Sequence, residues 1–181
     1  MIYFSHSMNH ADHVRLIRSG IKEKGGVWAD LGSGTGAFTL ALRDLIGPEG
    51  TIYSIDRDLA SLARQKKSMD EQFPDTEITY IVADFTGPLE VPPLDGIVMA
   101  NSLHFIKDKI PVLRSLKKLL KVEGKFLIVE YNADTGNQWV PYPFSFRTFE
   151  KLAKDSGFYE INMLSTVPSD FLGEIYSAVA S

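Results

Sequence analysis

Residues 27–36 read VWADLGSGTG, an apolar run followed by three glycines at alternate positions. The run predicts a buried β-strand. Gly32 and Gly34 predict a tight turn that lets a ligand approach the backbone, and Gly36 would open the next helix. The stretch also fits the dinucleotide fingerprint G-x-G-x-x-[GA] if Ala37 takes the third place. The loop therefore indicates a nucleotide-like ligand without deciding which one, and a purely structural glycine turn remains the alternative.

The composition is that of one soluble globular domain. The chain has 181 residues, of which 44% are hydrophobic and 23% charged, so we expect residues 1–181 to form a single domain around one core. The net charge of -4 argues against a general nucleic-acid binder, because such proteins usually present a basic surface. There is no cysteine, which removes disulfides, thiolate metal sites and cysteine nucleophiles together.

No targeting or membrane signal stands out. The first 20 residues lack the apolar core of a signal peptide, and no apolar run approaches the roughly 20 residues that a membrane span needs. We therefore expect a cytoplasmic protein with no membrane span.

Strand-like and helix-like segments alternate five times along the chain. Short apolar runs, typical of parallel strands covered on both faces, lie at residues 27–31, 51–55, 78–83, 95–100 and 125–131. Helical spacing predicts helices at residues 10–23 after Asn9, at 36–46, after Asp58 with Leu59, Leu62, Ala63 and Met69 facing inward, after Asp108, and from Ser145 to Gly157. The pattern predicts an α/β, doubly wound sheet.

The last part of the chain follows a different pattern. Residues 158–164 and 171–179 are two strand candidates, and the segment STVPSD between them is too short for a helical crossover. We therefore expect the two strands to be antiparallel to each other.

Acidic side chains follow three of the predicted strands, where an open parallel sheet binds its ligands. Asp30 directly precedes the glycine loop, Asp56 ends the second strand and Asp84 ends the third. A carboxylate at Asp56 can accept hydrogen bonds from a ribose diol, and one at Asp84 from the amine of an adenine, with Phe85 offering an apolar edge. Taken singly, Asp56 is also explained as a helix cap and Asp84 as a turn carboxylate. The coincidence of the glycine loop, Asp56 and Asp84 at one sheet edge favours a binding site.

These residues carry a family resemblance. The string DLGSGTG at residues 30–36, with Asp56 and Asp84 at strand ends, resembles class I S-adenosylmethionine-dependent methyltransferases. It is most similar to the small-molecule branch of ubiquinone/menaquinone C-methyltransferases, also called methyltransferase type 11. Residues 100–105 resemble the fourth motif of that family, which borders the reactive methyl group. Residues 120–125 resemble the turn before the fifth strand, although Glu123-Gly124 stands where Pro-Gly is more common.

The resemblance implies a Rossmann-like sheet of seven strands in the order 3-2-1-4-5-7-6, with the last strand antiparallel. It also implies S-adenosylmethionine as cofactor and S-adenosylhomocysteine as product. In that family the glycine loop holds the methionine part, and the acid at Asp30 helps to hold its amino group. The cofactor-binding set that the resemblance implies is Asp30, Gly32, Ser33, Gly34, Gly36, Asp56, Arg57, Asp84, Phe85 and Asn101.

Two other functions stay open beside methyl transfer: an NAD(P)-dependent oxidoreductase, and a non-catalytic subunit that binds S-adenosylmethionine. A carboxylate two residues before the first glycine suits a cationic cofactor and would repel a pyrophosphate, and Asp84 has no standard task in NAD binding. The cofactor residues do not look degraded, which counts against a non-catalytic subunit.

The implied reaction is an in-line displacement at a sulfonium methyl, which needs a general base only if the acceptor must lose a proton. His104 is the candidate base, and a packed histidine is the alternative. His10 and His13 lie on one face of a predicted helix, and Asn101, Glu130 and Asn132 follow strands as magnesium ligands would. We expect no metal at either place.

Specificity for a small-molecule acceptor is expected from two segments. Residues 1–24, with Tyr3, are an N-terminal helix and lid, and residues 132–147 are a substrate loop rich in aromatics and proline. Trp139, Tyr142, Phe144 and Phe146 either form a wall for an apolar or planar acceptor or pack onto the sheet edge. We assign Tyr3, His104, Trp139 and Tyr142 to acceptor binding. The acceptor's identity and the oligomeric state stay open.

Overall fold

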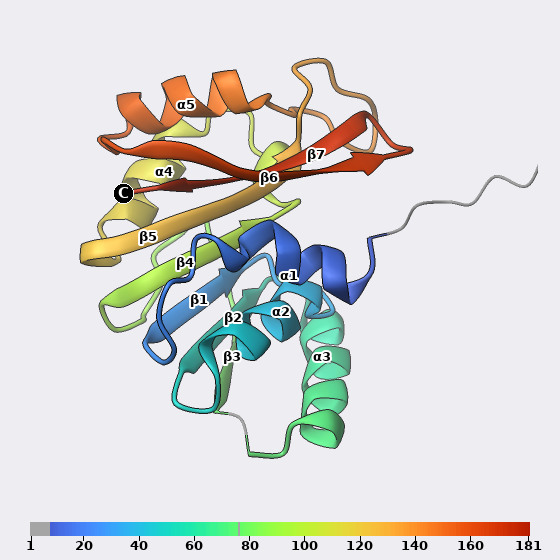
Figure 1. The fold of residues 1–181 in the computed structure, drawn as a ribbon, viewed down its shortest axis with the longest axis vertical. Helices are drawn as coiled ribbons and strands as arrows, with labels where there is room; N and C mark the ends of the chain where they lie inside the picture. Colours follow the sequence, from blue (N-terminus) through green and yellow to red (C-terminus); the bar gives the residue numbers. More distant parts are fainter. Residues whose placement is uncertain (1–7, 76) are drawn as a thin grey trace, which may run out of the picture.

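The structure, a computed structural model, describes residues 8–75 and 77–181. One sheet of seven strands has the order β3-β2-β1-β4-β5-β7-β6 (Figure 1). The strands are β1 (Val27–Leu31), β2 (Thr51–Asp56), β3 (Ile78–Val82), β4 (Leu94–Ala100), β5 (Leu120–Tyr131), β6 (Ile161–Ser169) and β7 (Gly173–Ala180). Strand β7 runs antiparallel to both of its neighbours, β5 and β6, and all other neighbouring pairs are parallel. The predicted Rossmann-like fold and its strand order are confirmed.

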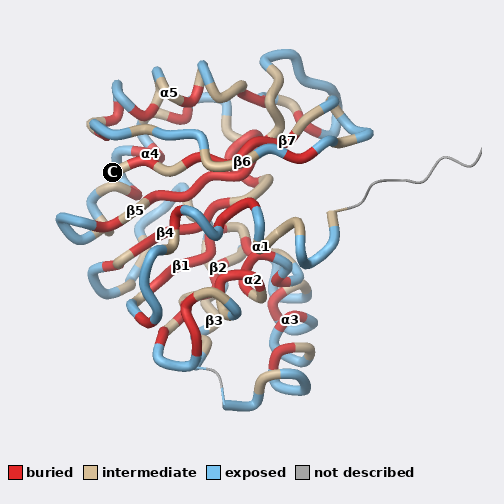
Figure 2. The backbone as a smooth tube through the Cα atoms, in the orientation of Figure 1, coloured by how far each residue is buried: buried red, intermediate tan, exposed pale blue. Residues whose placement is uncertain are grey.

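Helices cover both faces of the sheet. They are α1 (His10–Arg18), α2 (Ala37–Ile46), α3 (Leu59–Gln72), the 3₁₀ helix η1 (Leu103–Phe105), α4 (Ile110–Lys117) and α5 (Phe146–Asp155). Apolar residues of α1 and α2 pack with one set of strand side chains, and those of α4 and α5 pack with the other. Because strand side chains alternate between faces, Trp28 joins the first set and its neighbour Ala29 the second. Figure 2 shows the inner strands β1, β4, β5 and β7 as the most continuously buried part of the fold, whereas the edge strands β3 and β6 are mostly intermediate or exposed.

Several helix ends follow the sequence signals. Asn9 forms a capping box with Asp12, Asp58 accepts a hydrogen bond from the Ala60 amide, and Ser145 accepts one from the Thr148 amide. These side chains satisfy backbone N–H groups that a helix start leaves without partners.

Three details of the helix predictions are wrong. Helix α1 ends at Arg18 instead of continuing to residue 23. Lys109 occupies the cap position of α4 instead of Asp108, and it makes no capping hydrogen bond there. Leu59, at 66%, and Ala63 are exposed instead of facing inward, and Gln65 is buried on the inner side of α3. Gln65 takes the inner position because it forms hydrogen bonds with Thr39 and Ser54 inside the fold.

The strand predictions also need correction in two places. Strand β5 begins at Leu120, not at residue 125, because Leu94 pairs with Leu120 and Gly96 with Lys125, leaving the residues between them out of register. Strand β6 runs through most of the segment expected as a loop, because β6 and β7 stay paired to the Ser169–Gly173 position. The antiparallel pairing of these strands is confirmed.

Among the helices of the described residues, none is long and apolar enough to cross a membrane.

Candidate functional site

The glycine loop connects β1 to α2 at the carboxyl edge of the sheet. The backbone N–H groups of Gly32 and Ser33 both donate to the Ile55 carbonyl, at 2.8 and 3.1 Å, which turns the loop over the end of β2. Gly32, Gly34 and Gly36 have φ angles of 70°, 54° and 92°. These left-handed conformations disfavour any residue with a Cβ atom, which explains the glycines.

The three glycines differ in what surrounds them. A Cβ at Gly32 would lie 2.6 Å from Ser102 Oγ, and one at Gly36 would lie 2.5 Å from Gln65 Cγ. A Cβ at Gly34 would meet nothing within 4 Å. Gly32 and Gly36 therefore allow close packing, whereas Gly34 borders open space that a ligand can enter.

A buried polar network lies beneath the loop. Gln65 Nε2 donates to Thr39 Oγ1 at 2.8 Å, and Thr39 Oγ1 donates to Asp30 Oδ2 at 2.6 Å. The amide oxygen of Gln65 accepts from the hydroxyls of Ser33 and Ser54, at 3.3 and 3.0 Å. The network joins the loop to α2, α3 and β2, so it fixes the loop's position. Sequence reasoning missed Gln65, although a polar residue between inward-facing Leu62 and Met69 was the available signal.

The carboxyl group of Asp30 is the ionisable member of this network. Asp30 as a whole is only 1% exposed. Burial raises its pKa to about 7; the hydrogen bond from Thr39 lowers it, and the nearby Asp56 carboxylate raises it further. Because burial penalises the ionised form, a cationic group placed next to Asp30 would favour its ionisation.

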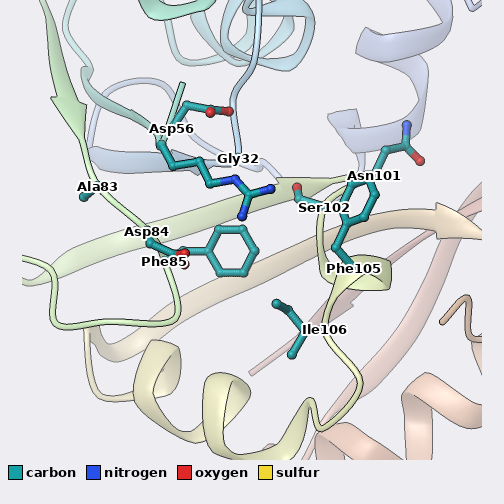
Figure 3. Close-up of a pocket in the computed structure, with 10 residues that line it drawn as sticks. Gly32, Asp56, Ala83, Asp84, Phe85, Asn101, Ser102, Phe105 and Ile106 are labelled. Atoms are coloured by element: carbon teal, nitrogen blue, oxygen red, sulfur yellow. The ribbon is translucent and has the colours of Figure 1, made fainter. Parts of the chain in front are cut away.

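A cavity of about 220 Å³ opens beside the loop (Figure 3). It is lined by Gly32, Asp56, Arg57, Ala83, Asp84, Phe85, Asn101, Ser102, Phe105 and Ile106. The cavity thus collects residues that follow β1, β2, β3 and β4. Of the expected cofactor residues, Asp30, Ser33, Gly34 and Gly36 are not part of this lining and belong to the loop or the network beneath it.

Asp56 connects the loop to the start of α3. Its Oδ2 accepts from the Gly34 amide and its Oδ1 from the Asp58 amide, both at 2.8 Å. Each carboxylate oxygen has a second lone pair, so Asp56 can still accept from the hydroxyl groups of a ligand.

Asp84 forms a turn on the opposite wall of the cavity. Its Oδ1 accepts from the backbone N–H and the hydroxyl of Thr86, at 2.9 and 2.7 Å. These hydrogen bonds hold the pKa of the Asp84 carboxyl below its usual value, and the one from the Thr86 backbone has the larger effect. The nearby Arg57 lowers this pKa further. Asp84 is therefore an ionised acceptor at the cavity rim, beside the Phe85 ring (Figure 3).

Asn101 follows β4 in a strained conformation. Its φ angle is 49°, which is unusual for a residue other than glycine. Its buried Oδ1 atom has no hydrogen-bond partner among residues 8–75 and 77–181. Because an unsatisfied buried acceptor costs free energy, this atom points to a donor supplied by a ligand.

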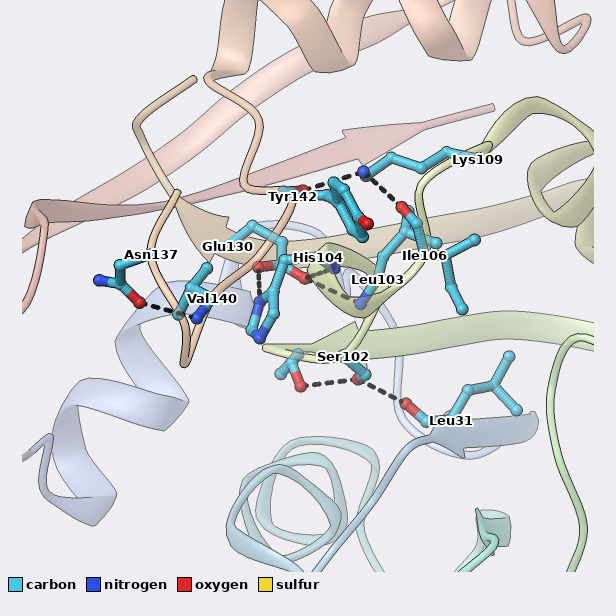
Figure 4. A network of polar contacts seen from close by, with 11 residues as sticks. Leu31, Ser102, Leu103, His104, Ile106, Lys109, Glu130, Asn137, Val140 and Tyr142 are labelled. Atoms are coloured by element: carbon cyan, nitrogen blue, oxygen red, sulfur yellow. Dashed lines mark hydrogen bonds and ion pairs between the residues drawn. The ribbon is translucent and has the colours of Figure 1, made fainter. Parts of the chain in front are cut away.

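His104 lies on η1, behind the cavity wall. Its Nδ1 contacts Glu130 Oε2 at 2.7 Å, and the other oxygen of Glu130 accepts from the backbone N–H groups of Leu103 and His104, at 3.0 and 3.2 Å. Both side chains are buried (Figure 4). The pair joins the segments that follow β4 and β5. Sequence reasoning listed Glu130 only as a magnesium option and missed its contact with His104.

The expected substrate loop divides its aromatic residues between two roles. Phe144 is buried and Phe146 packs on the core, whereas Trp139 is 67% exposed and Tyr142 is 41% exposed. The buried ammonium of Lys109 donates to the carbonyls of Ile106 and Tyr142, at 2.7 and 2.9 Å, and so anchors the loop to the segment after β4. Tyr3, the other expected acceptor residue, lies outside the described residues.

A row of rings runs from η1, past the end of β5, to the turn between β6 and β7. The ring of His104 is 4.3 Å from Phe105 and 6.0 Å from Tyr131, and Tyr131 is 5.6 Å from Phe171, measured between centroids. Phe105 and Phe171 are exposed, so the row offers apolar surface next to the cavity.

The residues considered for metal binding have other partners. His10 pairs with Asp44, the ring of His13 packs on Phe38, and Asn132 donates to Glu174. Across the described ranges no group of three His, Cys, Asp or Glu side chains has the arrangement of a metal site.

Comparison with solved structures shows the same fold. YcgJ from Bacillus subtilis superposes with a TM-score of 0.78 at 11% identity, over 94% of this chain and 98% of that one. A structure described as a SAM dependent methyltransferase from Aquifex aeolicus gives 0.72 at 16% identity, over 96% and 98%.

Sequence comparison shows the family. A 2-phytyl-1,4-naphtoquinone methyltransferase of Trichormus variabilis is 27% identical over 70% of this chain and 53% of its own length. The ubiquinone/menaquinone biosynthesis C-methyltransferase UbiE of Xylella fastidiosa is 25% identical over 69% and 49%. The aligned parts thus span about half the length of each relative. A family model described as a methyltransferase domain matches residues 22–169, and the chain therefore belongs to this family of methyltransferase domains.

Proposed function

We propose that this chain is an S-adenosylmethionine-dependent methyltransferase that acts on a small planar acceptor. The observation that carries the proposal is the convergence of Asp56, Asp84 and Asn101 on one cavity beside the glycine loop. Asp56 would accept from the ribose hydroxyls, Asp84 from the adenine amine, and Asp30 with Asn101 from the ammonium group of the methionine part. Arg57 and Phe85 would line the adenosine.

The residues present fit this cofactor. The Oδ1 atom of Asn101 is buried without a partner among the described residues, and the ammonium group is a donor for it. Gly34 adjoins open space, which leaves room for the methionine part. Acidic groups without a fixed cation, such as Asp30, suit a ligand that carries positive charge.

The cofactor supplies a methyl group already activated by the positive charge on sulfur. The chain's own residues then have to hold the two reactants in line and keep water out, which accounts for much of the rate in such displacements. The network of Asp30, Thr39 and Gln65 fixes the loop, and Lys109 fixes the acceptor-side loop.

The acceptor class follows from the exposed rings beside the cavity. Phe105, His104, Tyr131 and Phe171 form a row whose two ends, Phe105 and Phe171, are exposed and suit a planar apolar molecule. Trp139 and Tyr142 extend from the neighbouring loop. The naphthoquinone and ubiquinone/menaquinone methyltransferases among the relatives support a reduced naphthoquinone as the first acceptor probe.

An NAD(P)-dependent oxidoreductase is supported less well. The Gly34 amide, which would face a pyrophosphate in a dinucleotide site, already donates to Asp56. A carboxylate in that position repels phosphate groups. A non-catalytic subunit would bind S-adenosylmethionine in the same cavity, so only turnover separates it from the enzyme.

Titration calorimetry with S-adenosylhomocysteine and, separately, NADH tests the cofactor. We expect micromolar binding of S-adenosylhomocysteine and a loss of about 10- to 100-fold in Asp56→Ala, which removes acceptors worth about 1.5–3 kcal/mol. Asp58→Ala is the matched control, because Asp58 follows the same strand and caps α3 without lining the cavity. Binding of NADH alone, or unchanged affinity in Asp56→Ala, contradicts the proposal.

Mass spectrometry tests the reaction. The chain, S-adenosylmethionine and 1,4-dihydroxynaphthalene are incubated without oxygen, and the acceptor is expected to gain one methyl group. Tight cofactor binding without methylation of this or other planar acceptors would favour the non-catalytic subunit.

A further inference from the structure

The two oxygens of Glu130 have separate tasks. Oε1 accepts from two backbone N–H groups, those of Leu103 and His104, at 3.0 and 3.2 Å. Oε2 contacts Nδ1 of His104 at 2.7 Å. The carboxylate is therefore oriented by the backbone of η1, with one oxygen left for the imidazole ring (Figure 4).

This arrangement selects one form of the neutral histidine. An ionised carboxylate can only accept hydrogen bonds, so Nδ1 of His104 carries the proton in the short contact. The other ring nitrogen, Nε2, then keeps its lone pair and acts as a proton acceptor. Figure 4 shows that this second nitrogen points away from Glu130.

The free nitrogen lies next to the proposed acceptor surface. Within the described part of the chain no hydrogen-bond partner of Nε2 is found, and the ring lies between Phe105 and Tyr131. Phe105 also lines the cavity beside the glycine loop. His104 itself is 3% exposed and is not part of this lining, so its ring lies directly behind the wall that Phe105 forms, where the cavity and the row of rings meet.

Other charged and titratable groups surround Glu130 without bonding to it among the described residues. Lys109 and the hydroxyl-bearing residues Tyr131 and Tyr176 interact electrostatically with the carboxylate. The Lys109 ammonium donates to the carbonyls of Ile106 and Tyr142 and keeps a positive charge near this buried carboxylate.

We propose that His104 is the proton acceptor of the reaction and that Glu130 is its positioning residue. The acceptor is then a molecule whose nucleophilic atom carries a proton, such as a phenol or hydroquinone, and this inference rests on the proposed function. Nε2 takes that proton, while the nucleophile's electron pair bonds to the methyl carbon and the sulfur keeps the electrons of the broken carbon–sulfur bond. The resulting imidazolium stays bonded to the Glu130 carboxylate.

The glutamine substitution of Glu130 tests the tautomer directly. In Glu130→Gln the amide oxygen is held by the two backbone N–H groups, so the NH₂ group faces Nδ1 and forces the proton onto Nε2. Long-range ¹⁵N–¹H NMR on ¹⁵N-histidine protein, at a pH where the ring is neutral, is expected to show Nδ1–H in the wild type and Nε2–H in the variant. The histidine signals that are present in the wild-type spectrum and absent in that of His104→Asn are assigned to the ring of His104. Nε2–H in the wild type overturns the proposal, whatever the activity.

Turnover of 1,4-dihydroxynaphthalene tests the catalytic role. Glu130→Gln and His104→Asn are each expected to lower kcat by about 10²–10⁴-fold. His104→Asn keeps a side-chain donor for Glu130 but lacks Nε2, so a structural role alone would leave turnover near wild type. His10→Asn, on the exposed start of α1, is the matched control.

Binding of S-adenosylhomocysteine separates the two possible failures. Wild-type and variant affinities within about twofold show that the fold and cofactor site are intact, so a loss of turnover then belongs to the proton transfer. Absence of binding in the wild type contradicts the proposed function instead. Normal turnover in both variants, with the cofactor bound, refutes the role of His104.

Discussion

Two glycines of the same loop are expected to lose different amounts of stability on substitution by alanine. Gly32 and Gly34 both have positive φ, at 70° and 54°, so each alanine incurs about 1–2 kcal/mol of backbone strain. At Gly34 the new methyl group meets nothing within 4 Å, and the strain is the whole cost to the fold.

At Gly32 the new methyl group would also collide with Ser102. Its Cβ would lie 2.6 Å from Ser102 Oγ and 2.7 Å from Ser102 Cβ. Ser102 is buried, and its hydroxyl donates to the carbonyls of Leu31 and Ala100, so it cannot move aside freely. Overpacking adds about 1–3 kcal/mol, which brings the expected loss for Gly32→Ala to about 2–5 kcal/mol.

Thermal unfolding and calorimetry separate the two effects. For a domain of this size we expect Tm to fall by about 4–20 °C in Gly32→Ala and by about 2–8 °C in Gly34→Ala. Because the Gly34 methyl occupies space proposed for the methionine part, Gly34→Ala is also expected to lose about tenfold or more in affinity for S-adenosylhomocysteine. Wild-type affinity in Gly34→Ala, or an equal loss of stability in both variants, refutes this reasoning.

Two further predictions concern buried charged groups. Burial raises the pKa of Asp30 to about 7, so the folded chain holds a proton between about pH 4 and 7 that the unfolded chain has released. The free energy of unfolding should therefore fall as pH rises through this window, by up to about 1.4 kcal/mol per unit, and Asp30→Asn should flatten this slope in urea titrations. Lys109→Met leaves the carbonyls of Ile106 and Tyr142 without their donor, and a loss of about 2 kcal/mol is expected in the same assay; hydrogen exchange should rise near Tyr142. An unchanged pH slope in Asp30→Asn would contradict the raised pKa of Asp30. Unchanged hydrogen exchange near Tyr142 in Lys109→Met would contradict the anchoring of the loop by Lys109.

The cofactor side of the site could be predicted from local sequence patterns more completely than the acceptor side. Asp30, Asp56 and Asp84 were predictable because each lies at or just beyond the carboxyl end of an apolar strand, and the carboxyl ends of parallel strands meet at one edge. The acceptor side depends on loops. The sequence shows four aromatic residues in the segment 132–147 after β5, and only packing decides that Phe144 is buried while Trp139 is exposed.

The sequence by itself determined the alternation of strands and helices and the position of the glycine loop, because hydrophobic period and glycine conformation are local properties. With the family resemblance it also indicated the strand order. Only the tertiary structure decided that Gln65 fixes the loop from α3 and that Glu130 orients His104 from β5. Such pairs join residues 26 or more positions apart, and burial then selects the partner of each polar group. No pattern along the chain encodes which distant side chain satisfies a buried one.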